Sequence, residues 1–237
     1  MVVPNGSGPT VDLPMRKERA KEQTAGGIKK RRRAGAAHNQ PVMPTLIIIA
    51  LLSTTQDIRA VMDRAMADFR AGRIEQSLEG FDRVARISPG DAPYLWQRGI
   101  AQFYAGQFRE CRDMFVSHRT VNPDDVENAV WHFLCVARAE SPDAARRQML
   151  PVGPDSRVPM REVYRMFKGE MTQAQVMKAA GADPAAQFFA RLYVGLYLEV
   201  TGERDAGRVQ IEIAAEDRFA RVGGYMHDVA RVHLKVP

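Results

Sequence analysis

Two cysteines and three histidines are the residues whose types and spacing could support metal binding or nucleophilic catalysis. His132 and Cys135 lie three residues apart, which places them on one face of a helix, and His227 and His233 lie close together near the C-terminus. Zinc requires four convergent ligands, and the CxxC and HExxH spacings that supply them are absent from the sequence. We therefore expect these side chains to be structural, with no metal site and no cofactor.

Neither cysteine has the surroundings of a reactive nucleophile. Cys111 and Cys135 both fall within apolar helical patterns, where a cysteine packs as a small hydrophobic residue. No helix start or basic cluster beside them would lower a thiol pKa, and nucleophilic-serine, phosphate-loop and dinucleotide motifs are absent from the sequence. We expect no enzymatic activity and no catalytic residue. A disulfide framework is excluded, but a single bridge between the two cysteines stays open.

The net charge of +6 is confined to the start of the chain. Residues 1–42 hold nine Lys or Arg against three acidic residues, and the remaining 25 basic residues face 25 acidic ones. The rest of the chain is therefore neutral and lacks the basic face of a dedicated nucleic-acid reader. We expect nucleic acid to be a disfavoured partner.

The first 56 residues have the composition of a leader rather than of a folded domain. Residues 1–42 mix Gly, Pro, Ser and Lys/Arg without apolar periodicity, which indicates a disordered basic tail or a targeting leader. Residues 43–56 contain the apolar run 46–52, which is shorter than the roughly 20 residues of a membrane span but matches the centre of a cleavable signal. The alternatives are a helix that covers the end of the fold, or membrane association. Targeting to an organelle such as a plastid, or export, is favoured.

The elements that position the rest of the chain follow a repeat of 34 residues. Segments 58–91 and 92–125 carry the same residue classes at this constant offset, and 34 is the period of tetratricopeptide helix–turn–helix units. Glycine permits the tight turn inside each unit, phenylalanine fills the space between units, and proline ends the second helix. The structural repeat positions are Gly72, Phe81, Pro89, Gly106, Phe115 and Pro123, with Gly195 and Gly202 in a later unit.

Helical patterns also fill the remainder of the sequence, and strand patterns are nearly absent. The further helices are predicted at 124–139, 141–150, 160–168, 172–180, 184–201, 204–217 and 225–235. The fold class is therefore all-α, with residues 57–237 forming a short right-handed superhelical stack of helix–turn–helix repeats.

The repeat positions closely resemble the tetratricopeptide repeat family across residues 58–125 and again across 187–217. The layout of residues 58–234 is also similar to NlpI-type lipoproteins of bacteria and to related tetratricopeptide proteins of algae and plants. The segments behind this second resemblance are Trp131-His132-Phe133-Leu134-Cys135, Val152-Gly153-Pro154-Asp155, Tyr164-x-x-Phe167-Lys168-Gly169 and Phe188-Phe189-x-x-Leu192-Tyr193-x-Gly195-Leu196-Tyr197.

The resemblance implies a non-catalytic adaptor or scaffold that holds other proteins. The bacterial lipoproteins also imply an anchor through a lipidated cysteine. No cysteine follows the apolar run here, because the next one is Cys111. An algal or plant-like relative with a targeting leader fits this sequence better.

Five side chains of the first helices are expected to face the concave side of the stack, where repeat proteins bind peptides. These residues are Met62, Met66, Trp96, Ile100 and Tyr104. Met and Trp suit adaptable apolar recognition, but the alternative is that they pack against a neighbouring helix or beneath residues 46–52. Some family members grip a terminal carboxylate with an Asn where Met66 and Ile100 stand, so that mode is not expected. We expect the partners to be proteins or peptides, with self-association also open.

Overall fold

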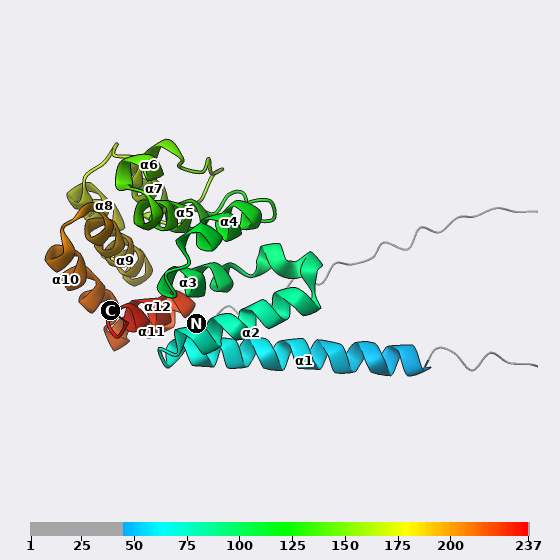
Figure 1. Ribbon diagram of the computed structural model, residues 1–237. Helices are drawn as coiled ribbons and strands as arrows, with labels where there is room; N and C mark the ends of the chain where they lie inside the picture. Colours follow the sequence, from blue (N-terminus) through cyan, green and yellow to red (C-terminus); the bar gives the residue numbers. More distant parts are fainter. Residues whose placement is uncertain (1–44, 237) are drawn as a thin grey trace, which may run out of the picture.

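A computed structural model describes residues 45–236, and side-chain positions within it from residue 57 onward. Every regular element of this part of the chain is a helix, so the predicted all-α class is confirmed (Figure 1). The expectations for residues 1–42 lie outside the described residues. The α-helices are α1 (Thr45–Arg70), α2 (Ile74–Ile87), α3 (Trp96–Tyr104), α4 (Phe108–His118), α5 (Val126–Ala139), α6 (Pro142–Arg147), α7 (Met160–Phe167), α8 (Gln173–Ala180), α9 (Pro184–Thr201), α10 (Arg204–Ala214), α11 (Ala220–Gly223) and α12 (Tyr225–His233), and the 3-10 helices are η1 (Pro89–Tyr94) and η2 (Asp217–Phe219).

The turns inside the first two helix pairs have the same hydrogen bonds at an offset of 34 residues. Gly72 follows α1 with a φ of 77° and Gly106 follows α3 with a φ of 74°, a region that glycine adopts without steric penalty. In each turn the glycine N–H donates to the carbonyl three residues back, and the next N–H donates to the carbonyl five residues back. Gly202 ends α9 with the same two bonds, so all three glycines lie in the predicted turns.

The second helices of these pairs place the predicted aromatic and proline residues as expected. Phe81 of α2 and Phe115 of α4 are fully buried in the core. Pro89 opens the 3-10 helix after α2, and Pro123 lies between α4 and α5. Both prolines follow the end of a helix because a proline inside it would remove a backbone hydrogen bond.

The α9–α10 pair packs closely because both helices present glycine at the crossing. A Cβ on Gly195 would lie 2.8 Å from the carbonyl oxygen of Gly207 and 2.5 Å from Cγ1 of Ile211. A Cβ on Gly207 would likewise lie 2.6 Å from the Gly195 carbonyl oxygen. Neither position has room for a larger side chain, which accounts for glycine at both.

α1 is longer than the repeat pattern predicts, since it runs without a break from Thr45 to Arg70. The sequence expectation divides this segment at residue 56, but no glycine or proline interrupts it there, and the helix begins directly after Pro44. Figure 1 shows the first part of α1 extending past the end of α2. None of the helices in the described part of the chain has the length and apolar character needed to cross a membrane.

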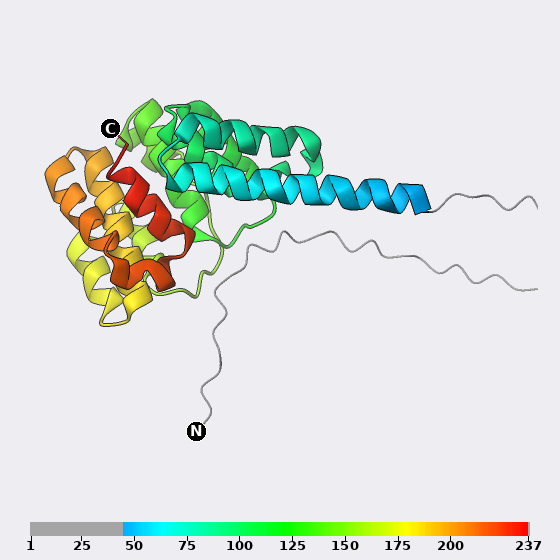
Figure 2. The ribbon, with the colours of Figure 1, turned by 90° about the horizontal axis from the view of Figure 1, so that it is seen from below.

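The helix pairs follow one another around an arc, and the last helix returns to the first (Figures 1 and 2). α12 packs against α10 and α11 and also against α1. Tyr225 at the start of α12 stacks on Phe69 of α1, with the ring centroids 5.4 Å apart, and meets Trp96 of α3 edge-on at 5.2 Å. One hydrophobic core runs from Met62 in α1 to Val232 in α12.

Candidate functional site

The structure places the five residues predicted for a concave groove in two different settings. Met62 and Ile100 are buried in the hydrophobic core and line no described cavity. The expectation that these two side chains face a partner is therefore corrected, and the alternative of packing against other helices describes them. The physical reason is that both are apolar side chains on amphipathic helices, and packing into the common core removes them from water.

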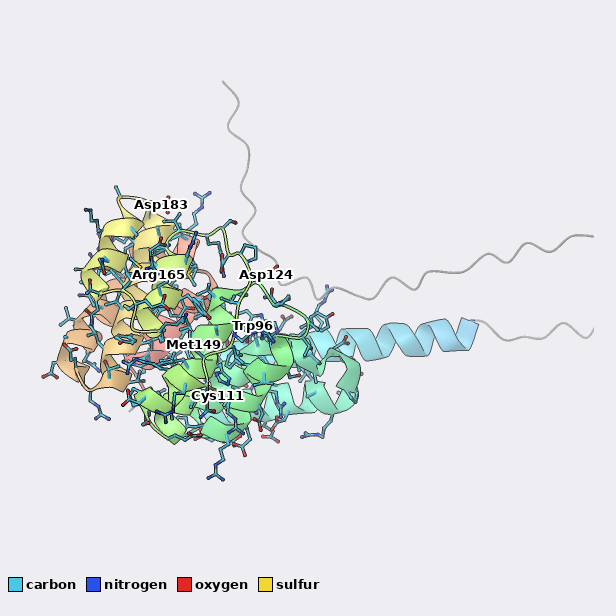
Figure 3. All side chains as sticks on the ribbon, turned by 90° about the horizontal axis from the view of Figure 1, so that it is seen from above. Trp96, Cys111, Asp124, Met149, Arg165 and Asp183 are labelled. Atoms are coloured by element: carbon cyan, nitrogen blue, oxygen red, sulfur yellow. A yellow bond between two sulfur atoms is a disulfide. The ribbon has the colours of Figure 1, made fainter. Side chains whose placement is uncertain are left out.

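Met66, Trp96 and Tyr104 are partly buried and pack against the edge of the core. Trp96 contacts α12 through Tyr225 and lies among the packed helices (Figure 3). The hydroxyl of Tyr104 lies 3.0 Å from Nδ1 of His233, also on α12. α12 therefore contacts the side of α3 that the sequence predicts to face a bound peptide.

One cavity in the described part of the chain lies between the α3–α4 turn and the α9–α10 turn, beside the end of α12. Its volume is about 590 Å³, within the range of small-ligand and peptide pockets. We call it the arginine cavity. It is lined by Phe103, Tyr104, Ala105, Gly106, Phe108, Arg138, Glu199, Arg204, Asp205, Arg208, His233 and Val236.

Three side chains connected by hydrogen bonds line one side of the arginine cavity. Nε2 of His233 lies 2.7 Å from a carboxylate oxygen of Glu199, and Nδ1 faces the Tyr104 hydroxyl. Burial raises the pKa of Tyr104 well above its usual value, and the charge of Glu199 raises it further. Tyr104 therefore stays a phenol that is hydrogen-bonded to Nδ1, and Nε2 of His233 faces a carboxylate, which can only accept, so Nε2 donates to Glu199. A tyrosine in this state is a poor nucleophile.

The arginines occupy the mouth of the same cavity. The guanidinium of Arg138 lies over the rings of Phe103 and Phe108, at 5.9 and 5.1 Å from their centroids. Among the described residues neither Arg138 nor Arg204 forms a salt bridge, whereas Arg208 pairs with a carboxylate one turn along α10 at 3.2 Å. These guanidinium groups can therefore accept an additional anionic partner.

The first turn of α10 adds backbone donors to the same place. Glu203, which precedes α10, forms no side-chain hydrogen bond that caps the helix. The first N–H groups of an α-helix lack intrahelical acceptors and carry partial positive charge, which favours an anion there. Arg204 and Asp205 lie in this first turn and Arg208 in the next one, and all three line the cavity.

The cysteines and histidines considered for metal binding are placed apart. Cys111 of α4 and Cys135 of α5 form a disulfide with a Cα–Cα distance of 5.9 Å, which answers the question that the sequence leaves open. His132 is buried on α5, and His227 directs Nε2 at the carbonyl oxygens of Ala215 and Glu216. Within residues 57–236, no three His, Cys, Asp or Glu side chains converge as a metal site would require.

The arginine cavity was not anticipated from the sequence, apart from Tyr104. Its arginines belong to α5 and α10, far apart along the chain, and many exposed helices carry such residues. The sequence feature that could have indicated the cavity is the pair of aromatic residues around the turn glycine Gly106. Phe103 and Phe108 form the apolar floor of the cavity.

No protein-family model matches this sequence. The curated proteins contain no match to it either.

Proposed function

We propose that this protein is a non-catalytic adaptor of the tetratricopeptide type, and that it binds an acidic segment of a partner protein in the arginine cavity. The observation that carries the proposal is the cavity of about 590 Å³ with arginines at its mouth and aromatic rings beneath them. A guanidinium group pairs with a carboxylate through two parallel hydrogen bonds, which makes arginine well suited to recognising Asp and Glu side chains.

The tetratricopeptide assignment is supported by the repeated turns. The turns at Gly72, Gly106 and Gly202 share φ sign and hydrogen bonds, and the first two are 34 residues apart. The similarity to NlpI-type proteins extends this proposal to the whole of residues 58–234, with partner binding as the shared role. Stacked helix pairs of this kind use their surfaces to bind proteins rather than to perform chemistry.

An acidic ligand is favoured over an apolar one by the charge at the cavity. Three arginines line the cavity against two carboxylates, those of Glu199 and Asp205, so the lining has an excess of one positive charge. The Arg138 guanidinium rests on aromatic rings, and no salt bridge among the described residues engages its N–H groups. An acidic side chain can pair with its edge while the adjoining peptide contacts the apolar floor.

The experiment is a titration of the full chain with fluorescein-labelled hexaglutamate, followed by fluorescence anisotropy, with hexaglutamine as the neutral probe. We expect hexaglutamate alone to bind, and the double substitution Arg138→Gln, Arg204→Gln to weaken it at least tenfold. Hydrogen bonds to charged groups contribute about 1.5–3 kcal/mol, and each 1.4 kcal/mol is a factor of ten in affinity. Arg161→Gln, on α7 and away from the cavity, is the matched control.

The basic segment at residues 29–33 could also attract a polyanion, and the design separates the two. Replacing Arg31, Arg32 and Arg33 with Ala should leave most of the hexaglutamate binding intact. The proposal fails if this triple variant abolishes binding while the cavity variant binds normally, or if hexaglutamine binds as tightly as hexaglutamate.

A further inference from the structure

A second, smaller cavity is lined in part by Trp131 and contains different chemistry from the arginine cavity. Its volume is about 140 Å³, and we call it the tryptophan cavity. It is lined by Trp96, Phe115, His118, Asp125, Glu127, Asn128, Trp131 and Met226. These residues come from α3, α4, the start of α5 and α12, so the returning helix supplies part of the wall.

The two carboxylates of the tryptophan cavity are held by a single arginine from the loop before α7. Arg157 donates to Asp125 at 2.5 Å and to Glu127 at 2.6 Å, and it also pairs with Asp155 at 2.6 Å. Tyr193 of α9 donates its hydroxyl to the other oxygen of Glu127. The carboxylates are thereby fixed in position before any ligand arrives.

This cluster carries an excess of negative charge. Three carboxylates converge on one guanidinium, and among the described residues no other Lys or Arg pairs with any of them. Burial raises the pKa of Glu127, and the neighbouring charge of Asp125 raises it further. The repulsion between Glu127 and Asp125 shows that Arg157 does not fully offset the two carboxylates, and a bound cation would supply the missing positive charge.

His118 adds a hydrogen-bond acceptor. Its Nδ1 lies 2.8 Å from the carbonyl oxygen of Pro93, which can only accept, so Nδ1 carries the proton. Burial lowers the pKa of His118, so the ring is neutral at pH 7 and Nε2 keeps its lone pair. A neutral imidazole nitrogen accepts a hydrogen bond from an ammonium group.

Aromatic rings form the remaining walls. Trp131 is 1% exposed and its indole Nε1 has no hydrogen-bond partner among the described residues. Trp96 and Phe115 complete the aromatic lining, and Phe115 stacks on Trp131 with a centroid distance of 6.3 Å. Aromatic rings attract a cation through the negative charge of their faces, most strongly for tryptophan.

We propose that the tryptophan cavity binds a compact organic ammonium ion, with its N–H groups directed at Glu127, Asp125 and His118 and its carbon chain against Trp96 and Trp131. An oxygen atom on the ligand would also satisfy Nε1 of Trp131. A calcium or magnesium ion fits this lining poorly, because those ions require six or more oxygen ligands and gain nothing from aromatic walls. The cation is either a free amine or the lysine side chain of a protein.

The chain contains two tryptophans, and both line this cavity, so its intrinsic fluorescence reports on the site directly. The full chain is titrated with ethanolammonium chloride, with Nα-acetyl-lysine methylamide, and with ethylene glycol and sodium chloride as controls. We expect a saturable change with at least one ammonium probe and with neither control. Binding of the free amine alone identifies a small-molecule site, and binding of the lysine derivative identifies a site for a basic side chain.

Glu127→Gln tests the assignment, since it removes one charge and keeps the shape of the side chain. We expect the dissociation constant of the ammonium probe to rise about tenfold, while Glu140→Gln, an exposed change after α5, leaves it unchanged. If Glu127→Gln does not fold, the melting temperature of the unaltered protein is the test. It should be higher in ethanolammonium chloride than in sodium chloride at equal ionic strength. An identical response to both salts, or an unchanged affinity in a folded Glu127→Gln variant, overturns the proposal.

Discussion

Mild acid is expected to destabilise this protein through His132 of α5. The side chain is 3% exposed, and its Nδ1 has no hydrogen-bond partner among the described residues. Burial lowers the pKa of His132 to about 4, from the usual 6.5, and the nearby charge of Arg112 acts in the same direction. The native state therefore holds this imidazole neutral under conditions in which the unfolded chain protonates it.

The sign and size of the effect follow from the two pKa values. Above pH 6.5 the imidazole is neutral in both states, and its contribution to stability is constant. Between pH 6.5 and about 4 the unfolded chain binds a proton that the native state does not, so stability falls as the pH falls. Each pH unit in this window costs about 1.4 kcal/mol, so two units remove roughly 2–3 kcal/mol.

The assay is urea unfolding at pH 7.5 and pH 4.5 for the unaltered chain and for His132→Leu. We expect the loss of unfolding free energy between the two pH values to be about 2–3 kcal/mol smaller in the variant. Phe133→Leu is the matched control, because it alters the neighbouring buried residue of α5 without removing a titrating group. It should lower stability equally at both pH values.

Other groups titrate in the same pH range, and their contribution cancels when the pH-dependent loss of stability in His132→Leu is compared with that of the unaltered chain. Burial lowers the pKa of His118 as well, so the unaltered chain should lose more than the share of His132 alone. This additional loss is common to all variants. The reasoning is refuted if His132→Leu loses as much stability between pH 7.5 and 4.5 as the unaltered chain does.

Three further expectations concern the packing of the helix pairs. Phe81→Ala or Phe115→Ala should each lower the unfolding free energy by about 3–5 kcal/mol, measured in urea, whereas a loss below about 1 kcal/mol would mean that the rings are not buried. Mass spectrometry of the unreduced protein should find Cys111 linked to Cys135, and Cys→Ser at both positions should cost roughly 3.5 kcal/mol. Gly195→Ala should cost about 1–3 kcal/mol in thermal unfolding, and an unchanged melting temperature would contradict the close α9–α10 crossing.

The local features of the fold could be predicted because their causes are local. The helix starts at Ser141 and Asp183 are set by their own side chains, which accept hydrogen bonds from backbone N–H groups three residues later. The sequence analysis starts the repeat region at residue 57, whereas α1 begins at Thr45. The helix is continuous because residues 53–57 contain no helix breaker. In each case the deciding residues are neighbours in the sequence.

The candidate sites could not be predicted in the same way, because they form between distant segments. Tyr104 meets His233 across 129 residues, and Tyr193 meets Glu127 across 66. Such contacts depend on how far the chain curves over successive helix pairs, which no short pattern encodes. The sequence predicts Trp96 as a candidate, but its position beside α12 follows only from the curvature.

The contact between α12 and α1 also fixes how many helix pairs the protein can have. In an open repeat array each unit touches only its neighbours, so duplication or deletion of a unit leaves the others in place. Here an additional pair inserted anywhere between α2 and α9 would carry α12 away from Phe69 and Trp96 and would open both cavities. The number of helix pairs is therefore constrained in this chain, and related proteins should vary in loop length rather than in the number of helix pairs.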